Sequence, residues 1–133
     1  MSLKLVNWNV EWATPKSRRT PEILKRIEQH KPEVICLTET LLDLLPQEGH
    51  VITSQPDYGY PIKKKRRKVL LWSKAPWKRS KDDGSKDLPP GRFVSGVTRT
   101  SIGDVAIIGV CIPWADARVK GAKVKRKRWE DHK

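Results

Sequence analysis

The sequence predicts an α+β fold in which one mixed β-sheet carries a helix on one face. Two apolar runs with strand character, residues 3–10 and 34–38, are separated by a segment with helical start and stop signals. A right-handed crossover of this kind places the two strands parallel in one sheet. From residue 40 onward the connections between apolar runs shorten, which favours antiparallel neighbours.

The first strand and the helix after it have distinct signals. Residues 3–10 carry apolar side chains on both alternating faces, which predicts a strand covered on both sides. The helix is expected to start with Thr20 as N-cap and Pro21 at the first helical position, and Pro32 should end it. Its apolar side chains, which should pack on the sheet, are Ile23, Leu24 and Ile27.

The remaining elements are shorter. Strands are predicted at residues 51–53 and 69–72, and a hairpin is predicted from two strands, 93–100 and 105–112. Gly103, in the connection between those two strands, suits a turn that needs a positive φ. Residues 82–91 are expected to form a surface loop. Trp77 either packs beneath the loop that its neighbour Pro76 bends or stacks on a base or sugar of a single nucleic-acid strand.

Polar side chains stand at the ends of the first two strands. Asn9 closes one apolar run, and Glu39 closes the next. In an open α/β sheet ligands are held at the carboxyl ends of the strands, so these two side chains are expected to converge. Amide and carboxylate oxygens suit a hard cation such as Mg²⁺, which takes one or two protein carboxylates and keeps several waters.

The same residues resemble a known family. The Asn-Trp-Asn-Val stretch at residues 7–10, the helix after it and the Pro-Glu-Val-Ile-Cys-Leu-Thr-Glu-Thr stretch at residues 32–40 resemble the opening of the endonuclease/exonuclease/phosphatase family, which has the deoxyribonuclease I-like fold. The order of the later strands matches, and residues 126–130 look like the start of the family's next helix. The resemblance covers nearly the whole chain but only the first half of the family's domain. It therefore implies that residues 1–133 are a partial domain, one half of a four-layer α/β sandwich, with the C-terminal half absent.

The resemblance implies metal-dependent hydrolysis of phosphoesters by a nuclease acting on nucleic acid. Glu39 would be the direct ligand of Mg²⁺ or Mn²⁺, and Asn9 would hold a metal-bound water or a phosphate oxygen. The family also uses an Asp-x-Asn pair and a late Ser-Asp-His element, and the sequence contains neither. Cys111 and Trp114 stand where the family often has a Tyr and an Asn near the phosphate, and Asp131-His132 is not expected to replace the missing acid/base pair. The chain is therefore expected to be inactive alone.

The positive charge is concentrated in the second part of the chain. Residues 1–60 hold 7 Lys/Arg against 8 Asp/Glu, whereas residues 61–133 hold 21 against 7. Basic tracts suit a phosphate backbone, because each neutralised phosphate releases counterions. The alternative function is thus a non-catalytic basic module that binds nucleic acid. The residues expected to contact phosphates are Lys63, Lys64, Lys65, Arg66, Arg67, Lys68, Lys125, Arg126, Lys127 and Arg128.

Length and composition favour one domain or part of one, since 133 residues with 37% hydrophobic content build one modest core. No apolar run has the length of a membrane span, and the start lacks the apolar stretch of a secretory signal, so we expect a cytoplasmic protein without a membrane partner. In a reducing compartment Cys36 and Cys111 are expected to stay free.

The inner face of the predicted sheet would be bare without a second half-domain, and soluble monomers rarely expose such a patch. Truncation, self-association through that face, and a separate polypeptide that covers it are the three open explanations.

Overall fold

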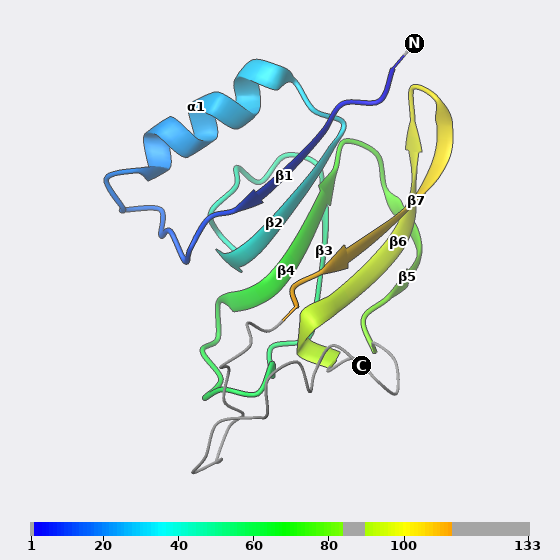
Figure 1. Cartoon of the computed structure of the whole chain (residues 1–133). Helices are drawn as coiled ribbons and strands as arrows, with labels where there is room; N and C mark the ends of the chain where they lie inside the picture. The colour runs from blue at the N-terminus through cyan, green and yellow to red at the C-terminus, as the bar shows by residue number, and fades with distance from the viewer. Residues whose placement is uncertain (1, 84–89, 113–133) are drawn as a thin grey trace.

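The computed structural model describes residues 2–83 and 90–112. Its elements in chain order are β1 (Leu5–Asn9), α1 (Thr20–His30), β2 (Val34–Leu41), β3 (His50–Thr53), β4 (Arg66–Ser73), β5 (Trp77–Lys81), the 3-10 turn η1 (Pro90–Arg92), β6 (Phe93–Thr100) and β7 (Gly103–Val110). The strands form two sheets, sheet A in the order β1-β2-β4-β3 and sheet B in the order β5-β6-β7. Helix α1 lies on one side of sheet A and sheet B on the other (Figure 1).

The β1-α1-β2 unit forms as the sequence predicts, with one shift at the start of the helix. Arg19, and not Thr20, is the N-cap residue, because the Thr20 hydroxyl is buried and donates to the Thr14 carbonyl oxygen at 2.5 Å. Pro21 lies at the helix start, and the helix ends where Lys31 adopts a left-handed conformation just before Pro32. Ile23 and Ile27 are buried against sheet A, as their spacing indicates.

Strand β1 pairs in parallel with β2, and this part of the topology is confirmed. The expectation that the first strand is covered on both sides is wrong. β1 is the end strand of sheet A, and only Val6 and Trp8 pack on the core beneath α1. The opposite side chains are exposed, with Leu5 at 45% of its surface, because sheet B packs on the other strands of sheet A and does not cover β1.

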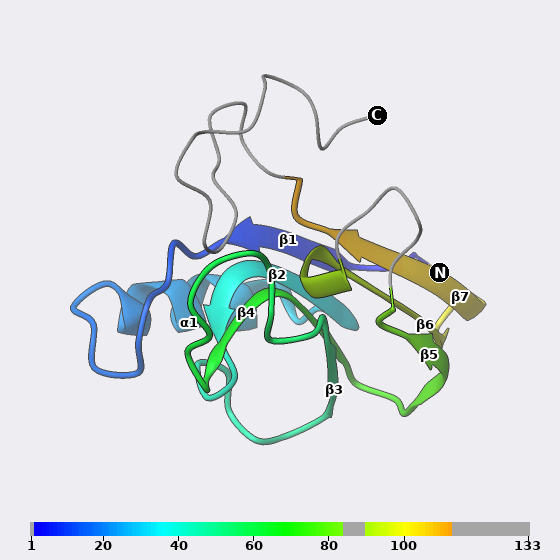
Figure 2. The same ribbon diagram turned by 90° about the horizontal axis from the view of Figure 1, so that it is seen from below.

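The α+β class and the mixed sheet with a helix on one face are confirmed, but the hairpin does not extend that sheet. β6 and β7 pair with β5 in a separate sheet that packs on sheet A (Figure 2 shows α1 at the left and this sheet at the right). The β4 ladder ends at Ser73, and residues 74–76 carry the chain from sheet A to β5 of the second sheet. The expectation of a bare face opposite α1 is therefore wrong, because sheet B covers that face. Exposed apolar side chains lie instead on the outer side of β7, at Ile108 and Val110.

A second core holds the two sheets together. It consists of the buried side chains Val34, Val69, Leu71, Val94 and Ile107. A buried hydrogen bond joins the Ser73 and Thr98 hydroxyls, 2.6 Å apart, across the same interface. Trp77 begins β5, packs against this core and donates from Nε1 to the His50 carbonyl oxygen of β3 at 3.0 Å.

Within the described ranges, no helix has the length and apolar character needed to cross a membrane.

Candidate functional site

The carboxyl ends of β1 and β2 bring Glu39 and the turn after β1 together. Asn9 is paired with Thr38, and the backbone N–H of Trp12 donates to the Glu39 carbonyl oxygen at 2.6 Å. Glu11, Trp12 and Glu39 all have positive φ values, of 47°, 60° and 50°. Residues other than glycine adopt such backbone conformations at a cost of about 1–3 kcal/mol each. Residues strained in this way cluster at functional sites. This corner of sheet A is therefore the first candidate.

Glu39 faces Lys68 across the β2–β4 ladder. The flanking register pairs, Thr38 with Val69 and Thr40 with Arg67, place the two side chains opposite each other. The Lys68 Nζ lies 3.7 Å from the Glu39 Oε1, and their side chains are 12% and 28% exposed. This ion pair is longer than a charge-assisted hydrogen bond, which is about 2.7–2.9 Å. The carboxylate is therefore partly neutralised but not tightly held.

The Asn9 side chain is held within its own turn. Its Oδ1 accepts a hydrogen bond from the Glu11 backbone N–H at 2.9 Å, a local turn of the kind that Asn side chains favour. The side chain is exposed and does not line the cavity described below. The structure thus places Asn9 and Glu39 at neighbouring strand ends but brings only Glu39 into the cavity.

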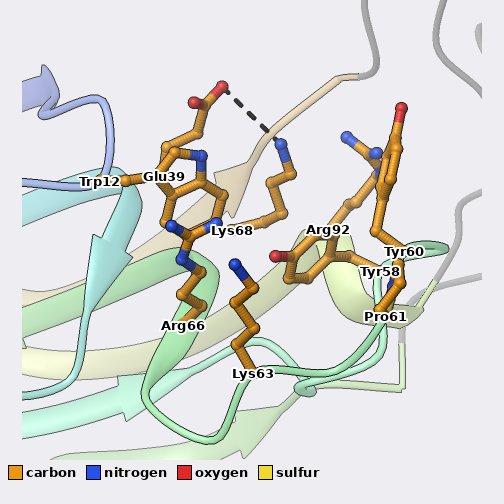
Figure 3. Close-up of a pocket in the computed structure, with 9 residues that line it drawn as sticks. All are labelled: Trp12, Glu39, Tyr58, Tyr60, Pro61, Lys63, Arg66, Lys68 and Arg92. Carbon is orange, nitrogen blue, oxygen red and sulfur yellow. Dashed lines mark ion pairs between the residues drawn. The ribbon is translucent and has the colours of Figure 1, made fainter.

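A cavity of about 490 Å³ opens beside Glu39. Figure 3 shows its lining side chains converging from β2, β4, η1 and two loops: Trp12, Glu39, Tyr58, Tyr60, Pro61, Lys63, Arg66, Lys68 and Arg92. Glu39 is the one carboxylate among these residues, against four cationic side chains. An anion is therefore favoured over a cation in most of this cavity.

Aromatic rings form one wall of the cavity. The Trp12 and Tyr58 rings are stacked with their centroids 5.8 Å apart. The Arg66 guanidinium lies 4.7 Å from the Trp12 centroid, and the Lys68 Nζ lies 5.2 Å from both ring centroids. Cations at such distances are attracted to the faces of the rings. The aromatic wall therefore positions the two cations beside Glu39.

Burial lowers the pKa of Lys68 from its ordinary value, and the nearby Glu39 carboxylate partly offsets that effect. Arg92 is only 4% exposed, and its NH1 lies 3.5 Å from the Cys111 carbonyl oxygen. Two cationic groups are thus held largely out of water at the inner end of the cavity. Charges in such surroundings act on a ligand more strongly than exposed ones.

The first basic tract is divided by the start of β4. Lys63, Arg66 and Lys68 line the cavity. The Lys65 Nζ instead pairs with the Asp43 Oδ2 at 2.9 Å, and Arg67 turns inward, where its NH1 donates to the carbonyl oxygens of Lys64 and Arg66. Burial lowers the pKa of Arg67, whose Nε has no hydrogen-bond partner. Lys64 is exposed. The second tract, with Lys125, Arg126, Lys127 and Arg128, lies outside the described residues, as do Trp114 and His132.

Both cysteines are free thiols, as we expected from composition. Burial raises the pKa of Cys36 to about 11, with a smaller contribution from Cys111. Burial also raises the pKa of Cys111, although Lys68 and Arg92 act in the opposite direction. Both thiols are therefore protonated at neutral pH and behave as small apolar side chains packed against the core between the two sheets.

The fit of this site to a divalent metal rests on one residue. Nowhere in residues 2–83 and 90–112 do three His, Cys, Asp or Glu side chains gather in a group that suits a metal ion. Mg²⁺, however, often takes only one or two carboxylates, with substrate phosphates and waters filling the other positions. Glu39 fits that role as a single oxygen ligand, and Lys68 competes for the same carboxylate.

Sequence reasoning missed five lining residues, Trp12, Tyr58, Tyr60, Pro61 and Arg92. Trp12 follows Asn9 by three positions, and a strand end followed by an aromatic residue is a weak signal that could have drawn attention to it. Tyr58 and Arg92 lie in a loop and in a 3-10 turn far along the chain, so no local pattern connects them with Glu39.

No family model and no curated protein matches the sequence. Solved structures do match by fold. An endonuclease/exonuclease/phosphatase from Beutenbergia cavernae superposes with a TM-score of 0.58 and 16% identity, over 86% of this chain and 39% of that one. Sphingomyelinase C from Streptomyces griseocarneus superposes with a TM-score of 0.59 and 14% identity, over 89% of this chain and 51% of that one. The chain thus spans about two fifths to one half of these proteins and has part of the deoxyribonuclease I-like fold, so the resemblance seen in the sequence is confirmed for the fold.

Proposed function

We propose that this chain, which has part of the deoxyribonuclease I-like fold, supplies the phosphate-binding part of the site of a divalent-metal-dependent phosphoesterase. The observation that carries the proposal is the position of Glu39. Its carboxylate lies at the carboxyl end of β2, in a cavity that is otherwise lined by cations and aromatic rings. The names of the two structural neighbours, a phosphatase/nuclease family and a sphingomyelinase, support phosphoester chemistry at such a site.

The residues of the chain have separate roles in this proposal. Lys63, Arg66 and Arg92 neutralise the phosphoryl oxygens, and the Asn9 turn fixes the backbone that carries Trp12. Glu39 would hold Mg²⁺ or Mn²⁺, which would supply Lewis-acid chemistry to the phosphoryl group. The cavity has no histidine and no second carboxylate among its described lining residues, and the sequence lacks the family's Asp-x-Asn and Ser-Asp-His elements. The chain alone is thus an incomplete catalyst.

Metal binding by Glu39 gives the first test. The change Glu39→Gln keeps the size of the side chain but removes its charge, so it should abolish the binding of Mg²⁺ or Mn²⁺ measured by calorimetry. Asp43→Asn is the matched control, because Asp43 is a carboxylate that pairs with Lys65 outside the cavity. That variant should bind the metal as the unchanged chain does. Equal metal binding by Glu39→Gln and the unchanged chain would remove Glu39 from the site.

Nucleic acid is the substrate that the charge distribution favours. Residues 61–133 carry 21 Lys/Arg against 7 Asp/Glu, and Lys63 and Lys64 are exposed next to the cavity. The same feature supports the second candidate, a non-catalytic nucleic-acid-binding module. A cytoplasmic location, and self-association or the docking of a second half-domain, remain predictions that accompany both candidates.

Salt dependence tests the contact between the first basic tract and phosphates. Lys63→Ser should flatten the slope of log K against log salt by about 0.7–0.9 for a single-stranded or duplex oligonucleotide, which is the change expected for one lost phosphate contact. Lys65→Ser should change the slope less, because Lys65 is paired with Asp43. Unchanged slopes in both variants, measured by fluorescence anisotropy, would leave the tract as a solvated segment.

A further inference from the structure

Lys68 stands apart from the other cations of the cavity in its surroundings. Its side chain is 12% exposed, and the contacts described for its ammonium group are one carboxylate and two aromatic faces. A buried ammonium is stable only when its charge is compensated, and an ion pair of 3.7 Å compensates it incompletely. An anion that comes closer to the Lys68 ammonium than the Glu39 carboxylate does would therefore stabilise its charge further.

The charge balance of the cavity points in the same direction. Lys63, Arg66 and Lys68 line the cavity together with the single carboxylate of Glu39, so positive charge exceeds negative charge in the described lining. Arg66 is fixed against the Trp12 ring and Lys68 lies between the Trp12 and Tyr58 rings, so both charges are already in position when a ligand arrives. Such pre-organised cations bind phosphate oxygens without reorganisation.

We propose that Lys68 is the phosphate-anchoring residue of this cavity and that the cavity binds a phosphoryl group without a divalent cation. While the cavity is empty, the Lys68 ammonium pairs with the Glu39 carboxylate. This inference rests on the proposed function only for the identity of the ligand as a phosphoester. Lys68, on β4, thus binds the phosphoryl group of the ligand before any reaction, which a bound metal would otherwise do. The chemistry that the cavity recognises is a phosphate monoester or diester, whatever its source.

The shared carboxylate couples the two ligands. A phosphate that draws the Lys68 ammonium away from Glu39 leaves that carboxylate open to a metal, and a metal on Glu39 leaves Lys68 open to the phosphate. Coupling between two binding equilibria is reciprocal, so each ligand should tighten the binding of the other.

Calorimetry with inorganic phosphate in the presence of EDTA tests the proposal. The unchanged chain should bind phosphate. Lys68→Met, which keeps most of the length of the side chain and removes its charge, should weaken that binding at least about tenfold, since a hydrogen bond to a charged group is lost. Lys65→Met is the matched control, because Lys65 lies in the same tract but outside the cavity. Lys68→Arg, which keeps the charge, should retain part of the binding and guards against a folding defect in Lys68→Met.

The result that would overturn the proposal is phosphate binding of equal strength in the unchanged chain and Lys68→Met, or no binding by the unchanged chain in EDTA. Glu39→Gln separates this inference from the proposed function. It should bind phosphate in EDTA at least as tightly as the unchanged chain, because Lys68 loses its competing partner, while its metal binding is lost. Retained metal binding in Glu39→Gln would contradict the proposed function and leave the phosphate result standing.

Two further ligands in the same assay identify the source of the phosphate. A 5′-mononucleotide that binds more tightly than inorganic phosphate supports the proposal with nucleic acid as the source, because its base has a ring that stacks on aromatic side chains. Tighter binding of phosphocholine supports it with a lipid headgroup as the source. Weaker binding of both esters than of inorganic phosphate would contradict a phosphoester ligand.

Discussion

Purified residues 1–133 are expected to hydrolyse phosphodiesters at least about ten-thousandfold more slowly than a complete phosphoesterase of this fold, because a general acid and a general base each contribute about a hundredfold to ten-thousandfold. The sequence has no Asp-x-Asn and no Ser-Asp-His element, and the described lining of the cavity holds no histidine and no carboxylate besides Glu39. Positioning and charge stabilisation alone, which the cavity can supply, leave the leaving group without its proton. A fluorogenic phosphodiester and a labelled oligonucleotide, each with Mg²⁺ or Mn²⁺, are the substrates for this measurement.

Addition of the C-terminal half of a complete relative provides the positive control, since it would supply the missing acid/base groups and restore hydrolysis. Robust metal-dependent cleavage by residues 1–133, lost in Glu39→Ala, would contradict the expectation. It would mean that acid/base groups act in this chain at positions that the family pattern does not mark.

Leu71→Ala is expected to destabilise the chain by about 2–5 kcal/mol, the range for removal of a fully buried leucine side chain. Leu71 is 0% exposed and lies in the core between the two sheets. The packing there is close, because a Cβ on Gly109 of β7 would approach the Leu71 Cδ2 to 3.1 Å. Loss of this side chain should therefore weaken both sheets together, in a single transition.

Urea unfolding followed by circular dichroism measures this effect. Val51→Ala is the control, since Val51 is an apolar residue of β3 in the same sheet that is 48% exposed. It should change the free energy of unfolding by less than about 1 kcal/mol, as surface substitutions usually do. An effect of Leu71→Ala no larger than that of Val51→Ala would mean that sheet B does not pack on sheet A in solution.

The first third of the fold could be predicted from sequence because its signals are local. Pro21 and Pro32 mark the ends of α1, and the spacing of Ile23 and Ile27 identifies the face that packs on sheet A. Parallel pairing of β1 with β2 then follows from the handedness of the crossover. These features depend on neighbouring residues, and so a single sequence contains them.

The division into two sheets depends on contacts that no local pattern reveals. Residues 77–81 form β5, yet the sequence Trp-Lys-Arg-Ser-Lys lacks the alternation of a half-buried strand, because only Trp77 is partly covered. β4 likewise begins at Arg66, within a basic tract whose composition suggests a loop. Pairing with β2 imposes the strand conformation there, and only this pairing shows that Lys68 faces Glu39.

The candidate site was predictable in part for the same reason. Glu39 stands out because a carboxylate that closes a buried apolar run has few structural roles. Asn9 has an equally clear pattern, but its amide accepts a hydrogen bond from its own turn. The aromatic wall and Arg92 come from segments far apart in the chain, so the tertiary structure alone assembles them around Glu39.

Paramagnetic broadening by Mn²⁺ in a ¹H–¹⁵N NMR spectrum tests most directly whether Glu39 and its cavity form a metal and phosphate site. In the presence of phosphate, substoichiometric Mn²⁺ should broaden the amide signals of Glu39, Thr40 and Trp12 first, because these residues surround the carboxylate. The signals of the exposed face of α1 should stay sharp, and Glu39→Gln should restore the broadened signals. Broadening that persists in Glu39→Gln, or that begins at another part of the molecule, would contradict the account.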